Sequence, residues 1–163
     1  MKNPAIVGRE AECAQLEECM AQPSAQLIVI YGRRRVGKTY LINEFFGNNF
    51  AFKVTGAFGE DESFQIKTFT DELARRSGGQ YDTKASWRQV FAWLRDYLEQ
   101  QPKDRKQVLF FDEMPWLNSG DSSFLSVGLS SFSSCGFLFV SSEWQERAKM
   151  QGRNASISRY FFI

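Results

Sequence analysis

The chain has 163 residues, and its 20 lysines and arginines against 19 aspartates and glutamates give a formal net charge of +1. Its 43% hydrophobic and 24% charged residues are typical of a folded globular chain, which excludes disordered and collagen-like classes. The sequence contains no histidine, and this excludes Ser-His and Cys-His nucleophile pairs, histidine general bases and histidine-containing zinc sites.

The cysteines and the amino-terminal segment bear on the cellular compartment. Cys13, Cys19 and Cys135 form no CxxC pair, which argues against a structural zinc site and for a reducing environment. The first twenty residues lack the long apolar run of a secretion signal. We therefore expect a cytoplasmic protein. The near-zero net charge gives no reason to expect nucleic acid as a partner of this chain.

Strands and helices are predicted to alternate along the chain. Apolar residues at helical spacing predict a helix over 8–21, and an unbroken apolar run predicts a buried strand over 26–31. The later predicted elements are a helix from Tyr40 to Phe46, a strand over 50–55, helices over 62–76 and 86–100, and strands over 107–111 and 136–140. This alternation predicts a single domain over 1–163, an α/β/α sandwich of three layers around a mainly parallel sheet.

An uncharged, serine-rich stretch over 122–142 is long enough to raise the question of a membrane span. Serine is a poor residue for a hydrocarbon interior, and glycines interrupt the stretch. We therefore expect no membrane contact, and predict a serine-rich helix or loop followed by a buried strand.

A glycine-rich loop follows the first predicted strand and opens the next helix. Residues 32–39 read GRRRVGKT and fit the phosphate-loop pattern GxxxxGK[ST]. Gly32 permits the sharp turn, and Gly37 lets backbone N–H groups close around a phosphate. Lys38 is expected to reach the β- and γ-phosphates, and Thr39 to offer its hydroxyl to Mg²⁺. The candidate nucleotide-binding residues are Gly32, Arg33, Arg34, Arg35, Val36, Gly37, Lys38, Thr39 and Tyr40. At least two of the three arginines have simple solvation as an alternative role.

Two carboxylates end the strand predicted over 107–111. Asp112 lies 73 positions after Thr39, and in a parallel sheet both strand ends would lie at the same edge. We expect Asp112 to complete the Mg²⁺ site with Thr39, and Glu113 to direct the attacking water. Lys38 and Glu113 are thus the candidate catalytic residues. The alternative is an ordinary Asp-Glu turn after a core strand.

Ser141 and Ser142 end the last predicted strand and are candidate sensors of a γ-phosphate. Their alternative role is that of surface serines with satisfied hydroxyls.

These motifs resemble the AAA-like/STAND P-loop ATPases known as the archaeal ATPase group. The resemblance covers roughly residues 7–125. It is carried by VGRE at 7–10, YGRRRVGKTYLINEFF at 31–46, FAFKVTG at 50–56 and LFFDEMPWL at 109–117. It implies a P-loop NTPase fold and a Gly-Arg-Glu element near the adenine. It also implies Mg²⁺-dependent ATP hydrolysis that serves as a conformational switch.

Residues 126–163 depart from the family pattern. Relatives continue into a fifth strand and a small helical lid, so we expect a chain that is truncated or altered here and lacks both. One edge of the phosphate-loop strand is then expected to be open. Arg147, Arg153 and Arg159 are all available as the arginine that relatives direct at the γ-phosphate, and the sequence does not choose among them.

ATP hydrolysis is therefore the expected activity, with ATP and Mg²⁺ as ligands. The alternative is a non-catalytic ATP-binding or interaction module whose hydrolysis is impaired by the divergent carboxyl-terminal part. A small-molecule kinase is disfavoured because Glu113 directly follows Asp112, and a GTPase because no NKxD motif is present. A protein partner or self-association stays open.

Overall fold

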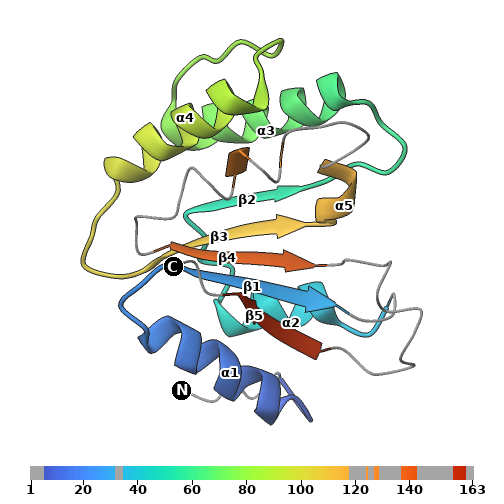
Figure 1. Cartoon of the computed structure of the whole chain (residues 1–163), viewed down its shortest axis with the longest axis vertical. Helices are drawn as coiled ribbons and strands as arrows, with labels where there is room; N and C mark the ends of the chain where they lie inside the picture. Colours follow the sequence, from blue (N-terminus) through green and yellow to red (C-terminus); the bar gives the residue numbers. More distant parts are fainter. Residues whose placement is uncertain are drawn as a thin grey trace.

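One mixed sheet organises the computed structural model, which describes residues 6–31, 35–117, 124, 127–128, 137–142 and 156–160 (Figure 1). Within these residues the strands lie in the order β2-β3-β4-β1-β5. Their bounds are β1 Gln26–Tyr31, β2 Phe52–Thr55, β3 Gln107–Asp112, β4 Phe137–Ser142 and β5 Ser156–Tyr160. The pairs β2–β3, β3–β4 and β4–β1 are parallel, and β5 is antiparallel to β1. The predicted α/β class with a mainly parallel sheet is confirmed.

The strand β5 corrects the expectation of an open edge beside the phosphate-loop strand. It pairs with β1 over its full length, from Leu27 opposite Tyr160 to Tyr31 opposite Ser156. Its direction is opposite to that of a fifth parallel strand, and the described residues include no helical lid. The sequence SISRY offers no apolar run, so the position next to β1, rather than local pattern, makes this segment a strand.

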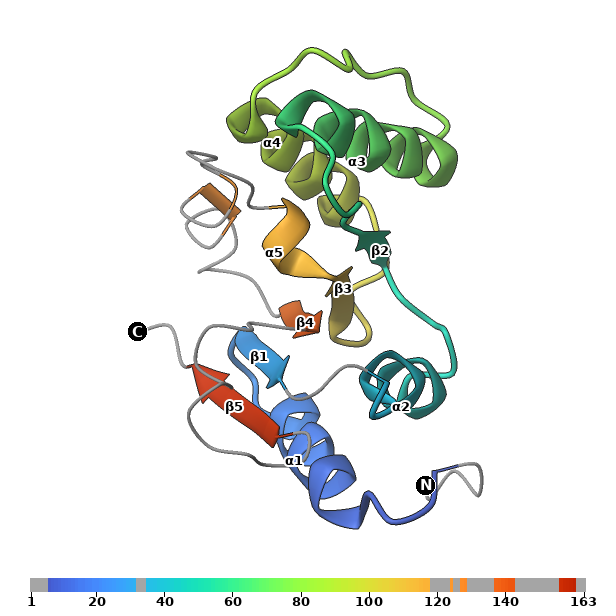
Figure 2. The same cartoon turned by 90° about the vertical axis from the view of Figure 1, so that its right-hand side faces the viewer.

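Helices cover both faces of the sheet and give the predicted three layers (Figure 2). On one face lie α3 (Glu62–Ser77) and α4 (Trp87–Glu99), and on the other lie α1 (Glu10–Ala21) and α2 (Lys38–Phe45). The short helix α5 (Met114–Leu117) follows β3 and was not predicted, because four residues are too few for a helical period.

Local side chains set the ends of α3 and α4. The Asp61 carboxylate accepts a hydrogen bond from the Phe64 N–H at 2.8 Å, which satisfies one unpaired amide at the start of α3. Gly78 ends that helix with a left-handed φ of 72°. Ser86 is the N-cap residue of α4 and donates its N–H to Oε1 of Gln89 at 3.1 Å.

Alternating side chains of the central strands divide the core in two. Leu109 and Phe111 of β3 pack with Phe69 on the side of α3 and α4. Val108 and Phe110 face the other way and belong to the cluster under α1 and α2. Val108 to Asp112 are all buried, and this period of two along a buried strand is what covering helices on both faces require.

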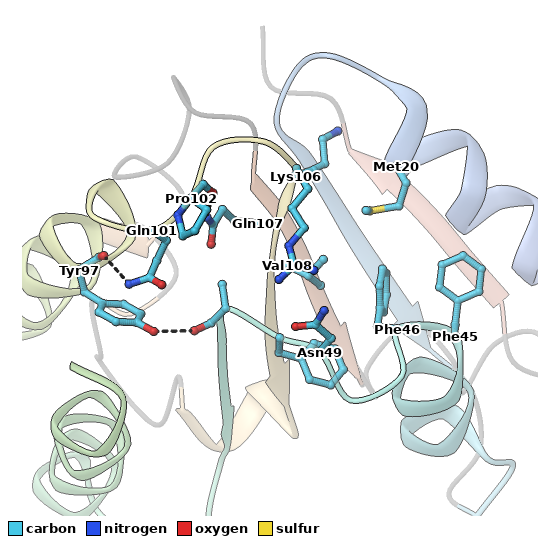
Figure 3. Close-up of a pocket in the computed structure, with 13 residues that line it drawn as sticks. Met20, Phe45, Phe46, Asn49, Tyr97, Gln101, Pro102, Lys106, Gln107 and Val108 are labelled. Carbon is cyan, nitrogen blue, oxygen red and sulfur yellow. Dashed lines mark hydrogen bonds between the residues drawn. The ribbon is translucent and has the colours of Figure 1, made fainter. Parts of the chain in front are cut away.

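A cavity of about 420 Å³ lies at the amino edge of β2 and β3 (Figure 3). Aromatic side chains from the end of α2, including Phe45 and Phe46, line it together with Tyr97 of α4 and Lys106.

The Lys106 ammonium donates to the carbonyls of Cys19, Gln22 and Ser24, which ties the end of α1 to the start of β3. Burial lowers the pKa of this group. The cavity is thus at the sheet edge opposite to the one where β1 and β3 end.

Candidate nucleotide-binding site

The phosphate loop joins the carboxyl end of β1 to the amino end of α2. Gly32, Arg33 and Arg34 lie outside the described residues, and Arg35 to Tyr40 are described. Gly37 immediately precedes α2 and has a φ of 80°, a left-handed conformation that favours glycine. The first turn of α2 therefore points its N–H groups and the positive end of its dipole toward the sheet edge where β1 ends.

The candidate side chains of the loop differ in their exposure. Lys38 is the first residue of α2 and is only 7% exposed. Arg35 is exposed with a φ of 64°, and Tyr40 is 53% exposed. The structure thus buries the lysine expected to reach the phosphates and leaves Arg35 and Tyr40 toward solvent.

Arg9 connects the phosphate loop to the start of α1. Its Nη2 donates to the Val36 carbonyl at 2.7 Å, and its Nη1 donates to Glu12 Oε1 at 2.8 Å. The resemblance placed the Gly-Arg-Glu element near the adenine. It gave no indication of a bond between Arg9 and the loop backbone.

Thr39 and Asp112 meet although they lie 73 residues apart. The Thr39 hydroxyl is 3.2 Å from Oδ1 and 3.1 Å from Oδ2 of Asp112. Asp112 is 7% exposed and ends β3, while Thr39 lies in the first turn of α2. The fold therefore joins the phosphate loop to the acidic strand at the carboxyl edge of the sheet.

These two side chains fit a magnesium ion by their chemistry. Hydroxyl and carboxylate oxygens are the ligands that Mg²⁺ takes in proteins, usually with one or two carboxylates and phosphates of the substrate. In the described part of the chain no three Cys, Asp or Glu residues cluster as metal ligands. Any metal at Thr39 and Asp112 would therefore depend on phosphate oxygens and water for the rest of its shell.

Glu113 has an unusual backbone conformation for a non-glycine residue. Its φ is 51°, its side chain is half-buried, and its N–H donates to Asp112 Oδ1 at 3.1 Å. Its carbonyl accepts from the Trp116 N–H at 3.0 Å, which starts α5. Left-handed residues outside glycine cost conformational energy and cluster at functional sites.

The candidate sensors lie at the end of β4, between β1 and β3. Ser141 is in register with Val29 and Phe111, and Ser142 with Ile30. Among the three candidate arginines, Arg147 and Arg153 lie outside the described residues. Arg159 lies in β5 and pairs with Ile28 of β1. Ile28 is three residues before Tyr31, the end of β1 that leads into the phosphate loop.

Together, this topology, the loop before α2 and the carboxylate after β3 define an α/β domain of the P-loop class. The chain belongs to the family of ATPase domains found predominantly in Archaea, which it matches over residues 6–129. It is an AAA-like P-loop ATPase domain by this membership.

Two known proteins illustrate the likeness. An uncharacterized ATP-binding protein from Methanocaldococcus jannaschii is 50% identical over 43 residues, which are 26% of this chain and 73% of that protein. A chain in the structure of Drosophila ORC bound to DNA superposes with a TM-score of 0.61 at 15% identity. This match covers 89% of the present chain and 40% of that chain, and it shows a shared fold.

The helices of the described residues include none that is long and apolar enough to cross a membrane.

Proposed function

We propose that this domain binds ATP at residues 32–40 and hydrolyses it with the help of Mg²⁺. The contact between Thr39 and Asp112 carries the proposal, because it unites a phosphate-binding helix terminus with a buried carboxylate. Membership of an ATPase family and the similarity to an ATP-binding protein support ATP as the nucleotide.

Each residue of the site has a separate task in this proposal. Lys38 and the N–H groups at the start of α2 hold the β- and γ-phosphates. Thr39 and Asp112 would hold the metal, which supplies neutralisation of phosphate charge when bound. Glu113 orients water and takes its proton as the water oxygen bonds to the γ-phosphorus. The bond from that phosphorus to the β,γ-bridging oxygen breaks, and ADP leaves with the electron pair.

We further propose that hydrolysis serves as a conformational switch. Arg9 bonds the Val36 carbonyl in the loop while it is ion-paired to Glu12 in α1. A change of the loop between ATP and ADP would therefore alter the contacts of α1. The single domain over 1–163 also stays our proposal, supported by a sheet whose strands run from Gln26 to Tyr160.

Phosphate release distinguishes this function from its alternative. We expect the wild type to release phosphate from ATP, Glu113→Gln to bind ATP but lose about a hundredfold or more of the rate, and Lys38→Ala to give the blank. If wild type and Glu113→Gln hydrolyse equally above that blank, the role of Glu113 is wrong. Binding of Mg-ATP without turnover by the wild type would instead indicate a non-catalytic ATP-binding module.

The DNA named in the Drosophila complex belongs to that complex. At 15% identity the likeness concerns the fold, and we propose no nucleic-acid partner for this chain.

A further inference from the structure

The end of β2 approaches the turn that carries Glu113 more closely than a side chain would allow. A Cβ atom placed on Gly56 would lie 2.5 Å from the Glu113 carbonyl oxygen and 3.0 Å from the Leu117 nitrogen. Both are backbone atoms, which cannot rotate away as a flexible side chain can. The Gly56 N–H also donates to the Asp112 carbonyl at 2.9 Å. Glycine at position 56 thus fits against both carboxylate residues of the site through their backbones.

A second contact joins the same loop to helix α5, which directly follows the turn with Glu113. The Phe58 ring meets the Trp116 ring edge-to-face, with centroids 4.5 Å apart. Between Gly56 and Phe58, both backbone groups of Ala57 bond to the side chain of Gln65, at 3.0 Å and 2.7 Å. Gln65 is fully buried in α3, so the loop is held by a rigid element. The loop therefore contacts the Glu113 turn through Gly56 and helix α5 through Phe58, with the anchored Ala57 between them.

We propose that the loop over 56–58 positions Glu113, with Gly56 and Phe58 as positioning residues that touch neither nucleotide nor metal. The inference rests on the proposed hydrolysis. Glu113 holds a left-handed φ of 51°, a conformation that persists only where its surroundings enforce it. The Gly56 approach and the Phe58–Trp116 contact supply that enforcement from outside the site.

The distances set the expected effect of a methyl group at position 56. The Glu113 carbonyl would have to move by about 0.9 Å for the contact to reach an ordinary 3.4 Å. A displacement of about 1 Å in a group that acts on the reaction can reduce the rate about a hundredfold. Lys38 and the α2 terminus lie on other elements, so ATP affinity should change little.

The test compares Gly56→Ala with Gly79→Ala in phosphate release and Mg-ATP calorimetry. Gly79 lies in the loop between α3 and α4, where an added Cβ would meet the Tyr81 hydroxyl at 3.1 Å and the Ser77 hydroxyl at 3.2 Å, both at the ends of side chains. We expect Gly56→Ala to lower kcat by about ten- to a hundredfold with Kd within about twofold of the wild type. Gly79→Ala should match the wild type. On a Glu113→Gln background, Gly56→Ala should add no further loss, which a merely structural defect would not show.

Phe58→Ala keeps the inference testable if Gly56→Ala does not fold. The Phe58 ring is 73% exposed, so its removal leaves the core intact. We expect kcat to fall by about two- to tenfold, the range of an aromatic pair, with Kd unchanged.

Wild-type kcat in the folded Gly56 and Phe58 variants, beside an inactive Glu113→Gln, would overturn this inference and leave the proposed function standing. An equal loss of ATP affinity and rate would also overturn it. Absence of turnover by the wild type would instead refute the proposed hydrolysis, and wild-type turnover by Glu113→Gln would refute the role assigned to Glu113 and this inference with it.

Discussion

Replacement of Thr39 by alanine tests the contact that unites the two halves of the site. The Thr39 hydroxyl donates to an Asp112 carboxylate that is 7% exposed, so water cannot fully replace the lost donor. A hydrogen bond to a charged group contributes about 1.5–3 kcal/mol to the free energy of unfolding. In a chain of 163 residues each kcal/mol shifts Tm by about 2–4 °C, so we expect nucleotide-free Thr39→Ala to melt about 3–12 °C below the wild type.

Thr39→Ser is the matched control, because it keeps the hydroxyl and removes a methyl group. The melting temperature of both variants is measured without nucleotide, by thermal unfolding monitored with circular dichroism. We expect the drop in Tm for Thr39→Ser to be less than half of the drop for Thr39→Ala. Only the serine variant should keep Mg²⁺-stimulated ATP binding. Equal melting temperatures of the two variants would show that the hydroxyl does not bond Asp112.

The other predictions concern the loop, the core and the metal. Arg9→Ala removes the donor to the Val36 carbonyl and should raise the Kd for ATP by up to about tenfold in calorimetry, whereas an unchanged Kd contradicts a role for this bond. Phe69→Ala removes a side chain that is fully buried among aromatic rings and leaves a cavity in the core. Urea denaturation should show that the free energy of unfolding falls by about 3–5 kcal/mol, and a fall of less than about 1 kcal/mol would refute this packing. Removal of Mg²⁺ with EDTA should reduce ATP turnover to that of Lys38→Ala, and turnover that survives EDTA would exclude the proposed metal site.

Much of the fold could be predicted because its signals are local. The apolar run of β1 and the helical spacing of α3 are visible within single short segments, and the structure places both elements within a residue or two of the predicted ranges. The strand β5 could not be found in this way. Its polar sequence becomes a strand only through its pairing with β1, which the local pattern does not encode.

The residues of the candidate site also differ in whether the sequence alone could bring them together. Thr39 and Asp112 could be brought together in advance, because parallel strands end at a common edge. The bond from Arg9 to Val36, the left-handed φ of Glu113 and the close approach of Gly56 depend on contacts between distant segments. The sequence singled out Arg9 within the VGRE motif but did not indicate its partner, and it showed Gly56 only as a glycine directly after a predicted strand. Such a residue is equally compatible with an ordinary loop.

The central claim is that ATP binds at the phosphate loop, and a Mg-ATP titration of the wild type beside Lys38→Ala tests it most directly. Lys38 is buried at the start of α2, where its ammonium would meet phosphate oxygens. We expect the wild type to bind and Lys38→Ala to lose at least about tenfold in affinity, as for a charged hydrogen bond. Equal affinity of the two proteins would contradict the account.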